Sequence, residues 1–515
     1  MPRRDPREAG GLDPRLRRSR AGGATPAGGR SGGSRAERGR PPRRSPLSRP
    51  WHLHRGPAPP RIRRDHLRRL RQDEPHACAR GSRPGPRKGQ RLRVQGTPRP
   101  LGGALSGARR GQGHLLKRET TAEPVARGGF VLLEAGLRPF FLGAGLYAAL
   151  GVGWWVGFLW GRLPLPTAWP SIWWHGHEMV FGFGTAAISG FLLTAVPQWT
   201  GSSPLSGARV GLLFLLWVSG RLAFLVGPTP AALALIDLSY LPVLVATVTL
   251  PMMRGGKTKN LVFPLLLTAM WIGNLLCHLS VLGWMQDQMQ RGLHLGTYGL
   301  VGIVAILAGR IVPEFTSNTL RRRGEPSEIR PPQVVEWAAK GSLFVALAAS
   351  VLGVDARFQG ASALLSAILF ALRMRGWRTL QILRDPIVWI LHAGHAFLVL
   401  ALLCKGIADL TGLLPATAAF HAFTAGTIGT MVLAVMSRAS LGHTGRPLVL
   451  RPILTWAYGL VVVGALVRVF AASFAAGFYR ELLLASGAAW AGGYAIFTWV
   501  YLPILVAPRV DGRSG

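Results

Sequence analysis

Cysteine and charged residues are scarce in this chain. Its 515 residues include 3 Cys and only 16% charged residues, whereas 49% are hydrophobic. Cys78, Cys277 and Cys404 have no paired spacing, which excludes a disulfide framework or a cysteine zinc site and predicts small buried side chains. Such a composition is typical of a membrane protein.

The first quarter of the chain lacks the residues that build a core. No Phe or Tyr precedes Phe130, and residues 1–130 hold 33 Lys and Arg against 9 Asp and Glu, a net charge of +24. Because such a segment cannot bury enough apolar surface to fold, residues 1–128 are predicted to be a basic, disordered tail. No apolar stretch follows the basic residues before Phe130, which excludes a secretory signal.

Two other interpretations of this tail stay open. A basic arm attracts nucleic acid or anionic lipid, although we expect no nucleic-acid partner. Alternatively, translation begins near residues 115–125 from a codon other than Met, since the next Met after Met1 is Met179.

Apolar runs dominate from Phe130 onward. Between Met179 and Val196, eighteen residues contain no charge, enough at 1.5 Å per residue to cross most of a bilayer of roughly 30 Å. We predict an all-α membrane protein with about twelve transmembrane helices over residues 129–508, followed by a short cytoplasmic tail at residues 509–515. The predicted spans are residues 140–160, 173–200, 208–226, 231–253, 261–283, 293–312, 334–353, 358–374, 387–408, 413–437, 453–472 and 481–503, of which the eighth is the shortest.

Lys and Arg are distributed unequally between the connections, and short cytoplasmic loops are enriched in these residues. Connections after odd-numbered spans hold about one each, namely Arg162, Arg291, Arg357, Lys405 and Arg480. Connections after even-numbered spans hold Arg209; Arg254, Lys257 and Lys259; Arg321, Arg322, Arg323 and Arg330; Arg373, Arg375, Arg378 and Arg384; and Arg446 and Arg451. This alternation predicts that both termini are cytoplasmic, and it supports the count of twelve spans.

Histidines open three of the even-numbered spans, which start at the outer face in this topology. His175 and His177 lie in span 2, His294 in span 6 and His421 in span 10, so three separate stretches converge on one level of the membrane. These spans are four apart, which suggests three repeats of a four-helix unit.

Small residues follow each of these histidines. Such residues admit either a neighbouring helix, the interpretation that we favour for the glycines alone, or a planar cofactor. They are Gly182, Gly299 and Gly426 five residues after His177, His294 and His421, and Thr185, Gly302 and Gly429 eight residues after them.

Span 9 adds His392 and His395, at i and i+3 on one face of its cytoplasmic half. A single membrane histidine is ordinarily a hydrogen-bonding residue, but imidazole is also a common ligand of haem iron and copper. Six histidines on four helices therefore favour metal or haem ligation. His443, in an inner loop after span 10, lies too far along the chain to join the outer group.

Two neighbours of these histidines carry chemistry of their own. Glu178 follows His177 directly, where it either holds a ring N–H, accepts a proton, or bonds the first free N–H groups of span 2. Tyr298 lies at i+4 from His294, one turn below it, where it either supplies a proton or an electron or anchors the helix at the interface.

Four blocks of the chain resemble one family. They are GLRPFF (136–141), WWHGHEMVFGFG (173–184), GFLLTAVPQWTG (190–201) and SRASLGHTGRPL (437–448). These blocks are similar to those of NnrS proteins, bacterial inner-membrane proteins described as binding haem and copper and as produced in response to nitric oxide. The similarity spans about residues 137–503, and Gln198 stands where the family usually has Asn.

The resemblance implies a multi-pass protein of the bacterial inner membrane. It implies haem b and copper as cofactors, nitric oxide or a related small molecule and the lipid bilayer as partners, and a role in resistance to nitrosative stress. It assigns no individual ligand and leaves open whether nitric oxide is converted or only bound. We hypothesise that His177, His294 and His421 bind the cofactor, that His175, His392 and His395 bind metal, and that Glu178 and Tyr298 support them through hydrogen bonds.

A weaker similarity links the chain to subunit I of the haem-copper oxidases. These proteins also have twelve helices in three groups of four, histidines on helices 2, 6 and 10, and a His–Tyr pair at i and i+4 on helix 6. Span 7 here lacks the histidine pair of that group. A copper centre of oxidase type is therefore not expected, and a shared fold does not transfer activity.

Two other functions compete with a haem and copper protein. The first is a transporter, because internal repeats and interrupted helices are features of many transporters. The prolines that would interrupt or end predicted helices here are Pro197, Pro242, Pro264 and Pro313. A helical scaffold for partner proteins is the second, and it predicts that all six histidines are dispensable.

Deletion of residues 1–120 tests the tail. We expect unchanged membrane insertion and metal content, because the apolar spans and their flanking charges direct insertion, and Arg127 and Arg138 remain to orient the first span. Membrane fractionation and the absorption spectrum of the truncated protein measure both properties. Loss of haem on truncation would show that the basic tail folds against the membrane domain.

Overall fold

A computed structural model describes residues 130–329 and 332–512, and every regular element within these residues is helical. The predicted all-α membrane class is therefore confirmed. Helices cover all twelve predicted spans, and Cys277 and Cys404 are free and buried as expected. The tail, Cys78 and Arg330 lie outside the described residues.

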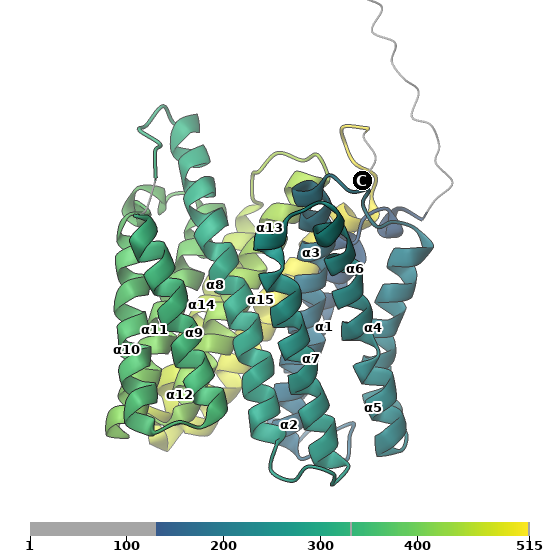
Figure 1. Cartoon of the computed structure of the whole chain (residues 1–515), viewed down its shortest axis with the longest axis vertical. Coiled ribbons are helices and arrows are strands. Elements are labelled where there is room, and N and C mark those ends of the chain that lie inside the picture. Colours follow the sequence, from purple (N-terminus) through teal and green to yellow (C-terminus); the bar gives the residue numbers. More distant parts are fainter. Residues whose placement is uncertain (1–129, 330–331, 513–515) are drawn as a thin grey trace, which may run out of the picture. The chain divides into compact units, whose positions relative to one another are not determined.

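The twelve spans form in chain order (Figure 1). They are α1 (Leu137–Leu159); α2 (Ser171–His177), η3 (Glu178–Gly184) and α3 (Thr185–Thr200); α4 (Ala208–Val226); α5 (Pro230–Leu238) and α6 (Tyr240–Arg254); α7 (Val262–Val281); α8 (Met289–Arg322); α9 (Gln333–Leu352); α10 (Ala356–Arg375); α11 (Pro386–Thr411); α12 (Ala416–His421), η6 (Ala422–Ile428) and α13 (Gly429–His443); α14 (Pro452–Phe474); and α15 (Tyr479–Val506). Among the described residues, eleven helices are long and apolar enough to cross a membrane. The remaining span of the twelve is α10, which is less apolar because Arg357, Arg373 and Arg375 lower its mean hydropathy.

Two predicted helix ends are wrong. Helix α8 continues ten residues past the predicted end at residue 312, with Pro313 inside it, and α13 continues to His443 rather than ending at residue 437. His443 is therefore the last residue of a helix, not part of a loop. The apolar pattern stops earlier because these helices carry polar groups at their C-terminal ends, where the Arg438 guanidinium lies 3.8 Å from the ring centre of Phe315.

Spans 2 and 10 share an irregularity that periodicity does not reveal. A seven-residue π-helical segment follows His177 directly in span 2, and another follows His421 directly in span 10. Such widened turns are rare and concentrate at functional sites. Their equivalent positions support the repeat relation between these two spans, whereas α8 of span 6 has no such segment.

The glycines below the three histidines admit neighbouring helices, as we favoured. A Cβ added at Gly182 would lie 2.6 Å from Nη1 of Arg221, and one at Gly299 would lie 2.7 Å from Cγ of Met270. At Gly426 the added atom would lie 2.5 Å from the Phe397 ring. Each glycine is thus needed for a side chain of another helix to approach.

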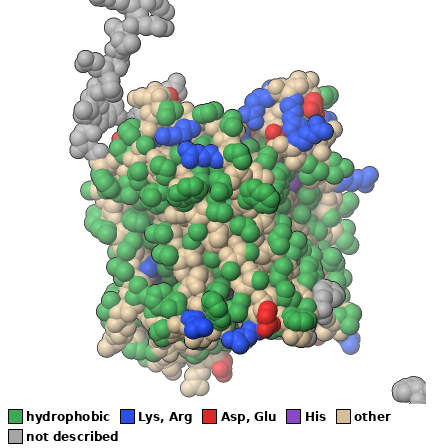
Figure 2. All heavy atoms as spheres, turned by 180° about the vertical axis from the view of Figure 1, so that it is seen from behind, with side chains coloured by type: hydrophobic (Ala, Val, Ile, Leu, Met, Phe, Trp, Pro, Cys, Tyr) green, Lys and Arg blue, Asp and Glu red, His purple; other side chains and the backbone are tan. Residues whose placement is uncertain are grey.

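Four spans form the buried interior. Span 2, α8, α11 and span 10 have 78%, 67%, 67% and 72% of their apolar windows buried, compared with 28% for α9. Figure 2 shows hydrophobic side chains over the middle of one face and most Lys and Arg toward its two ends, as expected of a protein in a bilayer.

The two described ends of the membrane domain meet at the same side. Nη1 of Arg138, in the first turn of α1, donates to the carbonyl oxygens of Leu505 at 2.8 Å and Ala507 at 2.7 Å. The Arg-rich connection after α8 lies toward this side as well (Figure 1). This arrangement fits an even number of crossings.

Cysteine substitution at Ser327 tests the orientation. If the connection after α8 is cytoplasmic, Ser327→Cys stays unreactive to an impermeant thiol reagent in intact cells and reacts after lysis. The substitution belongs in a Cys78→Ser background, because Cys277 and Cys404 are buried. Gln286→Cys, in the connection between α7 and α8, is the control that reacts in intact cells. The reverse labelling pattern would invert the topology.

Candidate functional site

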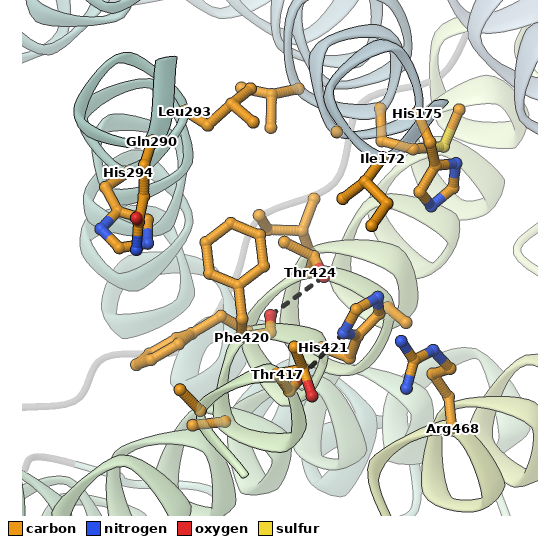
Figure 3. Close-up of a pocket in the computed structure, with 18 of the residues that line it drawn as sticks. Ile172, His175, Gln290, Leu293, His294, Thr417, Phe420, His421, Thr424 and Arg468 are labelled. Atoms are coloured by element: carbon orange, nitrogen blue, oxygen red, sulfur yellow. Dashed lines mark hydrogen bonds between the residues drawn. The ribbon is translucent and has the colours of Figure 1, made fainter. Parts of the chain in front are cut away.

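A cavity of about 710 Å³ opens among the helices at the end where α2 and α12 begin. Its volume lies within the range of roughly 300–1,000 Å³ typical of ligand sites. His175, His294 and His421 line it, one each from spans 2, 6 and 10 (Figure 3). The predicted convergence of these three spans is therefore present in the structure.

The walls of the cavity are mostly apolar and aromatic. Trp155, Met179, Phe183, Phe420 and Phe423 contribute to them. The π-helical segments of spans 2 and 10 supply part of this lining, since Met179 and Phe183 belong to η3 and Phe423 belongs to η6. The widened turns thus shape the cavity.

His421 has a fixed ring orientation. Its Nδ1–H donates to the carbonyl oxygen of Thr417 at 2.7 Å, which leaves Nε2 as the nitrogen with a free lone pair. A ligating histidine is typically oriented by such a bond from its other ring nitrogen. Arg468 of α14 reaches the cavity beside His421 (Figure 3).

The other two cavity histidines pack on aromatic rings. His175 stacks on Trp155 with ring centres 4.5 Å apart, and its Nδ1 is buried without a hydrogen-bond partner. His294 lies 5.5 Å from the rings of both Tyr298 and Phe420. Tyr298 therefore does lie one turn below His294 on the same face, and it also lines the cavity.

His177 does not line this cavity. It follows His175 by two residues, about 200° around a helix, and so faces a different set of helices. Its Nδ1 lies 2.9 Å from Oε1 of Glu178, and its Nε2 lies 2.7 Å from Oδ1 of Asn274. Both ring nitrogens therefore have hydrogen-bond partners. The contact with Glu178 agrees with the first of the three interpretations of this residue, in which its carboxylate holds a ring N–H of His177. Glu178 does not bond the first N–H groups of span 2, because that helix begins at Ser171.

His177 belongs to a group of buried polar residues that we call the charged cluster. It consists of His177, Glu178, Arg221, Asp237, Asn274 and His278, each at most 7% exposed. Its members come from span 2, α4, α5 and α7. Because charges inside a membrane are costly, such a cluster needs internal partners.

The guanidinium of Arg221 connects the two acids of the charged cluster. It forms an ion pair with Oδ1 of Asp237, and its Nη1 lies 3.2 Å from Oε1 of Glu178. Nδ2 of Asn274 donates to Oδ2 of Asp237 at 2.7 Å, and Nε2 of His278 lies 3.0 Å from the same oxygen. The hydroxyl of Tyr147, on α1, donates to Glu178.

Sequence reasoning missed Arg221, Asp237 and His278. It counted Lys and Arg in the connections and followed only the histidines that open even-numbered spans. The available indication was that Arg221 and Asp237 are isolated charges inside apolar runs, where an ionisable residue is functional by default.

His392 and His395 lie in a third location, on α11. The ring nitrogens of His392 lie 2.9 Å from the hydroxyls of Thr316 and Thr379. His395 packs on Trp377 at 4.3 Å, and neither of its ring nitrogens has a hydrogen-bond partner. Neither residue belongs to a group of three metal-ligating side chains among the described residues.

The two sites fit different kinds of cofactor. The cavity offers imidazoles, apolar walls and a guanidinium, which are the groups that hold a planar tetrapyrrole with acidic substituents. In the charged cluster, ligand atoms of His177, Asp237 and His278 all lie within 4.8 Å of one another, which suits a single metal ion.

Comparison with known protein families identifies a match over most of the chain. The family model described as NnrS protein matches residues 131–509, which confirms the resemblance of the sequence blocks. No curated protein matches the chain.

Replacement of Arg221 tests the energetic role of the charged cluster. In Arg221→Leu, Glu178 and Asp237 stay buried without a counter-charge, so we expect a loss of about 3–5 kcal/mol in stability. The apparent Tm and the yield in detergent should both fall. Arg254→Leu, at the exposed end of α6, is the control and should leave both unchanged. Equal stability of the two variants would contradict a structural role for the guanidinium.

Proposed function

The chain belongs to the NnrS family, and we propose that it is a membrane haem protein that binds nitric oxide at the cavity containing His175, His294 and His421. The observation that carries the proposal is the meeting of three imidazoles, from three separate spans, around one cavity of cofactor size. The family resemblance supports haem b as the cofactor and the response to nitric oxide as the context.

His421 is the first residue that would hold the haem iron. The bond from its Nδ1–H to Thr417 holds the ring and directs Nε2 toward the cavity. His294 is the second proposed ligand, with Tyr298 and Phe420 fixing its ring. When bound, haem supplies an iron that takes nitric oxide as a ligand.

Other residues of the cavity orient the cofactor. Arg468 offers a guanidinium to the acidic substituents of haem, which it pairs with more directionally than a lysine would. Trp155, Phe183 and Phe423 give the apolar contact surface. His177 is not part of this proposal, because both of its ring nitrogens are engaged in the charged cluster.

The proposed setting is the bacterial inner membrane with both termini cytoplasmic. The cavity then opens toward the outer side, and nitric oxide, a small apolar molecule, reaches it from the bilayer or from outside. Copper is the second cofactor that the resemblance implies. The proposal covers binding of nitric oxide and includes no turnover.

A transporter is the second candidate function. It is favoured by Pro197 and Pro313 inside helices and by the two π-helical segments, since interrupted helices line the substrate sites of many transporters. An absorption spectrum of the purified protein separates the candidates. A Soret band supports the haem protein, and its absence after expression with added haem would support the transporter.

Histidine variants test the ligands. We expect His421→Ala and His294→Ala to lose most of the bound haem, roughly tenfold or more per folded chain, because each removes an imidazole from the cavity. The Soret absorbance per chain measures this loss. His443→Ala, at the inner end of α13, is the control and keeps the spectrum.

His177→Ala distinguishes the two assignments of haem ligands. The sequence-based hypothesis expects loss of haem in this variant, whereas the cavity proposal expects haem in every chain that folds. Equal loss of haem in the His177, His421 and His443 variants, with normal expression, would contradict the cavity proposal.

A further inference from the structure

We propose that a pocket between α10 and α11 binds one anionic phospholipid, with the phosphate of its headgroup at Arg375 and Arg378. The pocket has a volume of about 570 Å³ and lies at the C-terminal end of α10. The cavity of the three histidines instead includes Gln359, near the start of the same helix. The lipid site is therefore separate from the proposed haem site, and it does not depend on the function proposed there.

Two guanidiniums form the basic part of the pocket. Arg375, the last residue of α10, is exposed and has no hydrogen-bond or ion-pair partner among residues 130–329 and 332–512. Nη1 of Arg378 donates to the carbonyl oxygen of Pro326, which uses one of the five N–H donors of a guanidinium. Arg378 also has a left-handed backbone, with φ at 54°, and residues in this rare conformation are enriched at ligand sites. Both guanidiniums thus have N–H donors for a phosphate.

The connections around the pocket are basic as well. Residues 321–328 and 375–385 contain six Arg and three acidic residues. Two of these acids, Glu325 and Asp385, form ion pairs with a single guanidinium, that of Arg323. Figure 2 shows Lys and Arg gathered at the upper right, where the end of α8 lies in the reversed view. Such an excess of positive charge beside a membrane attracts anionic headgroups.

The pocket continues from its polar end into an apolar groove. The hydroxyl of Thr379, which lines the pocket, lies 2.9 Å from Nδ1 of His392 and so marks the level of the polar end on α11. Ala396 and Val399 line the pocket four and seven residues further along α11, about 6 and 10 Å deeper at 1.5 Å per residue. Ala371 lines it on the facing side, in the last two turns of α10. These side chains form a groove for the upper part of an acyl chain.

The groove faces the bilayer. Ala371 and Ala396 are exposed, and Leu380, which also lines the pocket, is 84% exposed. Helix α10 lies at the left edge of the domain in Figure 1. A free phosphate would contact only the guanidiniums, whereas a phospholipid also covers the apolar surface below them. Because a guanidinium without a counter-charge is costly at a membrane boundary, an anionic lipid also compensates Arg375.

Lipid titration followed by native mass spectrometry tests the proposal. The full chain in detergent is titrated with phosphatidylglycerol and, separately, with phosphatidylcholine of the same acyl chains. We expect one phosphatidylglycerol to bind about tenfold or more tightly than phosphatidylcholine, because two guanidiniums favour the lipid with net negative charge. Equal affinity for the two lipids would overturn the proposal.

Glycerol phosphate distinguishes a lipid site from a site for free phosphate, because it carries the charged group without acyl chains. In large excess over phosphatidylglycerol, it should leave the bound lipid in place. Displacement of the lipid would show that the guanidiniums bind any phosphate and that the groove contributes nothing, which would overturn the assignment to a lipid.

Arg375→Gln tests the basic end of the pocket. We expect the affinity for phosphatidylglycerol to fall about fivefold or more, because one of two guanidiniums is removed. Arg384→Gln is the matched control, since Arg384 is an exposed residue of the same basic connection that does not line the pocket. Equal loss of affinity in both variants would show diffuse attraction by the basic surface in place of a defined site.

Ala371→Phe tests the groove without a change of charge. We expect the affinity for phosphatidylglycerol to fall about fivefold or more, because the larger side chain occupies the space of the acyl chain. Ala361→Phe, at another exposed position of α10 outside the pocket, is the control and keeps the affinity. Unchanged binding in a folded Ala371→Phe would refute the groove. If that variant does not fold, competition by glycerol phosphate decides, because it needs no substitution.

Discussion

The interaction on which the membrane domain most depends is the contact of one guanidinium with two carboxylates away from water. Arg221 of α4 lies between Glu178 of span 2 and Asp237 of α5, and all three are buried. An uncompensated charge at this depth would destabilise the fold. Gly182 leaves the room that Arg221 needs, since a side chain there would collide with the guanidinium. The packing of three spans is thus tied to one electrostatic arrangement.

Span 2 separates two sites of different chemistry. His175 faces a large apolar cavity, whereas His177 faces the compact charged cluster. The π-helical segment that begins at Glu178 contributes Met179 and Phe183 to the cavity and Glu178 to the cluster. One widened turn therefore serves both sites. A change in one of these sites is expected to influence the other through this segment.

Much of the fold was predictable because membrane helices are local structures. Apolar runs of sufficient length located all twelve helical spans. Of the histidines that open spans 2, 6 and 10, His175, His294 and His421 line one cavity, whereas His177, which was expected beside them, faces other helices. The ends of α8 and α13 were not predictable from the apolar runs, because polar residues such as Arg438 continue a helix where it has partners on other helices. The π-helical segments also escaped prediction, since their apolar pattern does not differ from that of an α-helix.

The sequence by itself determined the class of the protein, the spans and the candidate histidines, since these follow from hydrophobicity and from family blocks such as WWHGHEMVFGFG. Only the tertiary structure decided which histidines share a site. His175 and His177 are two residues apart, yet their partners are His294 and His421 for one and Asp237 and His278 for the other. The physical reason is that side chains at i and i+2 point to different sides of a helix, and long-range packing alone selects the helix that lies on each side.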